Sequence, residues 1–100
     1  MKPITDRPEA HLYVCTNERP EGKSCCKKVG GHEFFAKTKD KLIQEGIRSQ
    51  FWITRTGCLG FCNDVGCVVA LYRDGEAAPE IYSEVEADDF DKVWKSLTGQ

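Results

Sequence analysis

Residues 11–25, HLYVCTNERPEGKSC, contain the pattern from which the fold of this 100-residue chain can be argued. Residues 11–15 are β-prone and bounded by polar residues, so they predict a short strand that runs directly into Cys15. The following residues, 16–30, are rich in Asn, Pro, Gly and Ser, which predicts a long loop. Because Cys25 lies within that loop, we expect a strand that leads into a cysteine-bearing segment.

The same pattern recurs further along the chain. The aromatic and β-branched run FWITRT, residues 51–56, predicts a second strand. It ends at Gly57, where the segment CLGFC begins and supplies Cys58 and Cys62. Two cysteine pairs on separate loops suit a metal or iron–sulfur centre held between them. The residue pattern alone leaves zinc and iron–sulfur open, since thiolates bind both and His32 lies close to the first loop.

Two amphipathic helices are expected. Between residues 32 and 46 one helical stripe is mostly apolar, and Gly46 is a plausible stop; its members are Phe34, Phe35, Thr38, Leu42 and Ile43. Near the end of the chain four apolar residues recur at helical spacing, namely Phe90, Val93, Trp94 and Leu97. Asp88 and Asp89 would lie in the first turn of this helix, where they complement the positive end of its dipole.

The remaining segments complete an α/β fold. Residues 68–72 form an apolar run that predicts a buried central strand, and residues 81–85 alternate in polarity beyond a turn at 73–75. The order β-α-β-β-β-α favours a right-handed parallel crossover followed by a hairpin. We therefore predict a thioredoxin-like, four-stranded mixed sheet with two main helices, in a single domain over residues 1–100 with an ordered core at about 11–97. No thioredoxin-type C-x-x-C motif follows the first strand, so the fold order does not indicate disulfide exchange.

Composition narrows the functional classes. The amino terminus lacks the apolar run of a signal peptide, and no segment approaches a membrane span, so we expect a cytoplasmic protein with no membrane partner. In a reducing cytosol, six cysteines indicate metal or redox chemistry rather than disulfides. Residues 1–55 carry 11 Lys and Arg against 7 Asp and Glu, whereas residues 56–100 carry 3 against 9. Neither half contains a dense basic stripe, so nucleic acid is not an expected partner.

Four segments together resemble a known family: HLYVCTNERPEGKSC, RTGCLGFC, VVALYRDG and IYSEVEADDFDKVW. They are similar to the thioredoxin-like [2Fe-2S] ferredoxins, the group that includes the Shethna-type ferredoxins, over roughly residues 11–97. The resemblance implies a [2Fe-2S] cluster and a soluble one-electron carrier rather than an enzyme. It also implies the cluster ligands, which by the family pattern are Cys15, Cys25, Cys58 and Cys62.

The chain departs from the family pattern at three places. Cys26 stands where relatives usually carry a small residue, and Cys67 occupies the place of the proline in their Gly-Pro step. One additional residue lies between Cys62 and Gly66. Two interpretations of Cys26 and Cys67 are open: they replace a cluster ligand, or they pack as small apolar side chains. We favour the second, because free cysteine is often buried and inert. Cys25 keeps the Ser-Cys context of the family, and we favour it over Cys26 as a ligand.

Charge and glycine near the cysteines suggest how such a centre would be surrounded. Gly22, Gly57, Gly60 and Gly66 would let backbone amides approach the sulfur atoms. Candidate cations around the site are Arg19, Lys23, Lys27, Lys28 and Arg55. This basic collar predicts a redox partner protein with an acidic docking face, and the resemblance also allows a homodimer. The alternatives are a redox-sensing or protective protein that binds a partner enzyme through its cluster, and a zinc-stabilised interaction domain without redox activity.

Overall fold

The computed structural model describes residues 1–4, 6–16, 30–57 and 66–99. The elements are β1 (Ala10–Cys15), α1 (Gly31–Gln44), β2 (Phe51–Thr56), β3 (Cys67–Arg73), β4 (Glu80–Val85), a 3-10 turn η1 (Ala87–Asp89) and α2 (Phe90–Thr98). The predicted order β-α-β-β-β-α is confirmed. No helix of the described residues is both long enough and apolar enough to cross a membrane.

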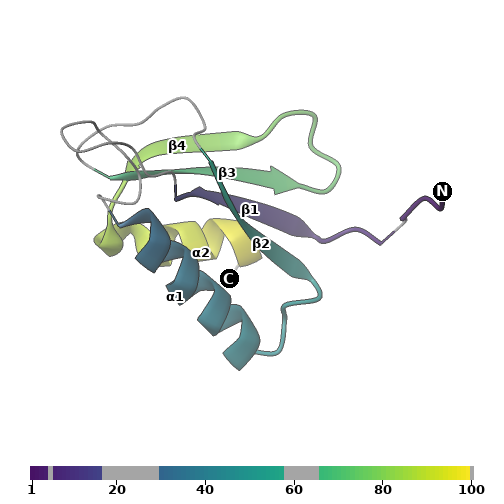
Figure 1. Ribbon diagram of the computed structural model, residues 1–100, viewed down its shortest axis with the longest axis horizontal. Coiled ribbons are helices and arrows are strands. Elements are labelled where there is room, and N and C mark those ends of the chain that lie inside the picture. Colours follow the sequence, from purple (N-terminus) through teal and green to yellow (C-terminus); the bar gives the residue numbers. More distant parts are fainter. Residues whose placement is uncertain (5, 17–29, 58–65, 100) are drawn as a thin grey trace.

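The four strands form one mixed sheet in the order β2-β1-β3-β4. β1 and β2 are parallel, as the strand–helix–strand order predicts, and β3 and β4 form the expected antiparallel hairpin. β1 also pairs antiparallel with β3, which makes β1 and β3 the two central strands. Both helices pack on the same face of this sheet (Figure 1).

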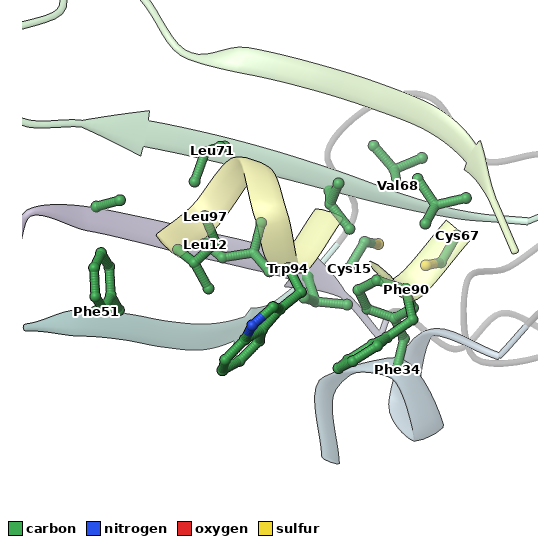
Figure 2. Close-up of a cluster of buried hydrophobic side chains, with 14 of the residues drawn as sticks. Leu12, Cys15, Phe34, Phe51, Cys67, Val68, Leu71, Phe90, Trp94 and Leu97 are labelled. Carbon is green, nitrogen blue, oxygen red and sulfur yellow. The ribbon is translucent and has the colours of Figure 1, made fainter. Parts of the chain in front are cut away.

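The hydrophobic core lies between that face and the two helices. The sheet contributes fully buried aliphatic residues such as Leu12 and Leu71, and the helices contribute Phe34, Trp94 and Leu97 (Figure 2). The aromatic rings of Phe34 and Phe90 meet edge to face with centroids 5.7 Å apart, which joins α1 to α2. Burial of these apolar surfaces is the main stabilising contribution to such a fold.

The first helix ends as the sequence predicts, but its apolar stripe is narrower. Gly46 adopts a left-handed conformation with φ of 69°, which lets the chain leave the helix and turn toward β2. Leu42 is fully buried, whereas Ile43, which the sequence places on the same stripe, is 51% exposed. Successive helical residues are about 100° apart around the axis, and only the Leu42 direction faces the sheet.

The second helix is shorter at its amino end than the sequence suggests. Phe90, Trp94 and Leu97 are buried, and the helix ends at Gly99 with φ of 77°. Asp88 and Asp89 belong to η1 rather than to the first turn of the helix, which corrects their predicted placement. The Asp89 carboxylate accepts a hydrogen bond of 3.0 Å from the backbone N–H of Glu86, and this bond favours a tight turn after β4.

The opposite face of the sheet, which neither α1 nor α2 covers, carries a row of aromatic rings (Figure 1). His11 stacks on Tyr13 with ring centroids 4.1 Å apart and meets Trp52 edge to face at 5.6 Å. Tyr13 in turn meets Tyr72 edge to face at 5.3 Å. These contacts cross from β2 through β1 to β3, so the rings reinforce the strand pairing.

Candidate metal centre

Three strands begin or end at one edge of the sheet, which we call the cysteine edge and which Cys15, Thr56 and Cys67 mark. β1 ends at Cys15 and the parallel β2 ends at Thr56, and these two residues are register partners. β3 runs antiparallel to β1 and begins at Cys67, so its first residue lies at the same edge. The chain segments that lead to Cys25 and Cys58 therefore leave the sheet from neighbouring strands.

Hydrogen bonds hold the ends of β1 and β2 together. The backbone N–H of Thr16 donates to the carbonyl of Thr56 at 3.0 Å, and the Thr16 hydroxyl donates to the same oxygen at 3.4 Å. Cys58 follows Thr56 by two residues. Since paired strands lie about 5 Å apart, the backbone of Cys15 lies close to that of Thr56, the residue two positions before the predicted ligand Cys58.

The described thiols at this edge are both buried. Cys15 is 0% exposed and Cys67 is 1% exposed, and both belong to the hydrophobic core (Figure 2). The pKa of Cys67 is raised from 9.0 to about 11, mainly by burial and to a smaller extent by the nearby charges of Cys15 and Asp89, against the opposing effect of a backbone hydrogen bond. Cys67 is therefore a neutral thiol near pH 7, and its packing fits the interpretation of this residue as a small apolar side chain.

The comparison with solved structures identifies this architecture. The chain is similar to the thioredoxin-like [2Fe-2S] ferredoxin from Aquifex aeolicus, with 32% sequence identity, a TM-score of 0.75, and coverage of 93% of this chain and 89% of that one. A cysteine-to-serine variant of the same ferredoxin matches at 33% identity and a TM-score of 0.72, covering 90% of this chain and 88% of that one. No family model and no curated protein matched the chain.

This chain belongs to the thioredoxin-like [2Fe-2S] ferredoxin family. The family resemblance predicted from the four sequence segments is thereby confirmed, as is the thioredoxin-like fold. Sequence identity at this level over nearly the whole chain is stronger evidence of family membership than the shared topology alone, because one fold supports many unrelated functions.

One predicted cluster ligand of this ferredoxin-family chain belongs to the described residues. Among its four predicted ligands, Cys15 is described, whereas Cys25, Cys58 and Cys62 lie outside the described residues, as does Cys26. Within the described part of the chain, no three His, Cys, Asp or Glu side chains gather in an arrangement that could hold a metal ion. The four-cysteine ligand set therefore stays a prediction.

The two histidines have other surroundings in this ferredoxin-family chain. His11 lies four residues before Cys15 on β1, which places it about 13 Å away along the strand. Its Nε2 atom is 2.8 Å from the Thr54 hydroxyl, and partial burial lowers its pKa. His32 is an exposed residue in the first turn of α1. The geometry excludes His11 from a centre at Cys15.

Acidic residues also lie at the cysteine edge, beside the segments that carry the predicted basic collar. Of the predicted basic collar, Arg55 is described and exposed on β2, and Arg19, Lys23, Lys27 and Lys28 lie outside the described residues. The end of β4 lies beside Cys67, and the acidic residues that follow it, Glu86, Asp88 and Asp89, lie in and before η1. Sequence reasoning missed this proximity, because it depends on the antiparallel pairing of β3 and β4.

Proposed function

We propose that this chain is a one-electron carrier that holds a [2Fe-2S] cluster through the thiolates of Cys15, Cys25, Cys58 and Cys62. The observation that carries the proposal is the membership of the chain in a family whose solved member is a [2Fe-2S] ferredoxin, at 32% identity over 93% of the chain. The pairing of Cys15 with Thr56 supports it, because it draws the first and second cysteine segments to one edge of the sheet.

The donor set fits this group. A [2Fe-2S] cluster takes four thiolates, two on each iron, and exchanges one electron when bound. The Aquifex aeolicus structures include variants in which one of two cysteines, four positions apart, is replaced by serine. Cys58 and Cys62 have the same spacing. We infer that these two cysteines hold one side of the cluster and that Cys15 and Cys25 hold the other.

The residues around the predicted ligands would stabilise the negative charge of the four thiolates. Backbone N–H groups of Gly57 and of the other loop glycines can donate hydrogen bonds to sulfur without a side chain in the way. Cys67 is buried in the core at the same edge as Cys15.

Electron paramagnetic resonance after dithionite reduction tests the proposal. A reduced [2Fe-2S] centre has an unpaired spin, so anaerobically purified protein should give a low-temperature signal of about one spin per chain, together with visible absorbance before reduction. A colourless protein that contains zinc and gives no signal would support the zinc-stabilised interaction domain. Quantification of iron and zinc in the same sample removes any ambiguity from partial loading.

The electron carrier and the redox-sensing alternative differ in what happens at the partner. A carrier delivers one electron to a docked protein, whereas a redox-sensing or protective protein changes its affinity for an enzyme when the cluster changes oxidation state. Stopped-flow oxidation of the reduced chain by a bound enzyme distinguishes them. Delivery of one electron per chain supports the carrier, and redox-dependent binding without electron delivery supports the alternative.

We further propose that the redox partner presents an acidic docking face to the cations at positions 19, 23, 27, 28 and 55. This proposal rests on the sequence of the first cysteine segment. The acidic residues in and before η1 lie at the same edge of the sheet and oppose it, so the two charge groups must be reversed separately to test it.

A further inference from the structure

β4 contains a bulge close to the cysteine edge. Val69 pairs with Tyr82 and Cys67 pairs with Val85, so two residues of β4, Ser83 and Glu84, stand opposite one residue of β3. Glu84 has a φ of 57°, and it is the one non-glycine residue with positive φ among those that the structure describes. Because this conformation is unfavourable for a residue with a side chain, it persists only where its surroundings require it.

Gly66 fits against this bulge with no space for a side chain. A Cβ atom on Gly66 would lie 2.6 Å from the carbonyl carbon of Glu84 and 2.6 Å from that of Val85, and closer still to the Val85 carbonyl oxygen. All three atoms are backbone atoms, so no side-chain rotation can relieve the overlap. Gly66 is also buried, and it directly precedes β3.

We propose that Gly66 and the bulge at Glu84 form a backbone clamp that positions the segment carrying Cys58 and Cys62 for cluster binding. This inference rests on the proposed function. Gly66 is the first described residue after that segment and follows Cys62 by four positions, which span at most about 14 Å of chain. The place where the bulge holds Gly66 therefore limits where the sulfur atom of Cys62 can lie.

The firm position of β3, which follows Gly66, supports the clamp. β3 is paired on both sides, with β1 and with β4, and its residues Val68, Val69 and Leu71 are almost completely buried. A side chain at Gly66 cannot easily displace this strand. The displacement would instead act on the bulge or on the segment of residues 58–65, which carries the two predicted ligands.

The first test compares Gly66→Ala with Gly75→Ala. Gly75 lies in the turn between β3 and β4 with φ of 85°, and a Cβ atom there would meet nothing within 4 Å. Both substitutions strain the chain, but Gly75 lies at the opposite end of the sheet from Cys15 and Cys67. For each purified holoprotein we would measure thermal unfolding, the g-values of the reduced cluster, and the rate of cluster loss to an iron chelator.

We expect Gly66→Ala to shift the g-values and to lose its cluster several-fold faster than wild type. Gly75→Ala should unfold at a lower temperature while keeping the wild-type g-values. A Gly66→Ala protein with wild-type g-values and a wild-type rate of cluster loss would overturn the clamp. A shift of the g-values in Gly75→Ala as large as that in Gly66→Ala would also overturn it, since the signal would then report general destabilisation.

A second pair of variants tests the clamp from the β4 side, and it decides the question if Gly66→Ala does not fold. Glu84→Val and Glu84→Asn both remove one exposed carboxylate and have similar size, but asparagine tolerates positive φ and a β-branched residue does not. We expect Glu84→Val to shift the g-values and Glu84→Asn to leave them unchanged. Equal spectra for the two variants would contradict the clamp.

These outcomes separate the inference from the proposed function. A wild-type protein with no reduced-state signal would reject the cluster itself, and the clamp with it. A wild-type protein with the expected signal, together with unchanged spectra in Gly66→Ala and Glu84→Val, would reject the clamp alone.

Discussion

Cys15 and Thr56 are register partners at the ends of neighbouring parallel strands, and the backbone N–H of Thr16 donates to the Thr56 carbonyl at 3.0 Å. Forty-one positions separate Cys15 from Thr56 in sequence, yet the sheet brings them together. This relationship positions the exits of both predicted cysteine segments, and it is the structural basis for the predictions about the cluster.

Removal of the Cys15 thiol should abolish most cluster binding, whereas removal of the Cys67 thiol should not. We expect Cys15→Ala to contain little iron and to lack the visible absorbance of the wild type, because one of the four proposed ligands is absent. Cys67→Ala is the matched control, since it removes a second buried thiol from the same edge. Circular dichroism would establish that both variants fold, and full iron content in Cys15→Ala would contradict the ligand assignment.

The raised pKa of Cys67 predicts a loss of stability at alkaline pH. Its thiol has a pKa of about 11 in the folded protein against 9.0 for an unperturbed group, so the unfolded chain loses this proton at lower pH than the folded one. The stabilising contribution is complete below pH 9 and disappears as the pH rises toward 11; its size is about 2–3 kcal/mol.

Thermal unfolding of wild type and Cys67→Ala between pH 8 and pH 11 measures this effect. Other groups titrate in the same range, so the difference between the two proteins is the relevant quantity. The wild type should lose stability more steeply above pH 9. Parallel curves for the two proteins would show that Cys67 is not responsible.

Leu42 and Ile43 should differ sharply in their contribution to stability although they are adjacent and similar in size. Leu42 is 0% exposed and Ile43 is 51% exposed. We expect Leu42→Ala to lower the free energy of unfolding by about 2–5 kcal/mol, because it leaves a cavity between α1 and the sheet. Ile43→Ala should cost less than about 1 kcal/mol. Denaturant titration measures both, and equal losses would contradict the observed helix orientation.

Charge reversal should identify which side of the cysteine edge meets the redox partner. If the partner presents an acidic face, Lys23→Glu combined with Lys27→Glu should slow electron transfer at low ionic strength, and added salt should reduce the difference. Glu86→Lys combined with Asp88→Lys should then accelerate the transfer. Slower transfer in the second variant and no change in the first would show that the partner is basic instead.

The helices and strands were predictable to within a few residues because their local patterns agree with the tertiary fold. The aromatic and β-branched content of residues 51–56 predicted β2 with its observed bounds, and Gly46 marked the end of α1. The family resemblance was also predictable, because the cysteine segments and their flanking strands carry it together. Ile43 shows the limit of this reasoning, since its spacing fits an apolar stripe although the sheet contacts only one side of the helix.

Local sequence patterns were enough to predict the elements, their order and the cysteine pairs, because propensities, turn residues and spacing act over short distances along the chain. Tertiary contacts place Cys67 beside Cys15 in the core, acidic residues at the same edge, and Gly66 against the bulge at Glu84. These relationships arise from strand pairing between segments distant in sequence, where register and close packing rather than local preference select the neighbours.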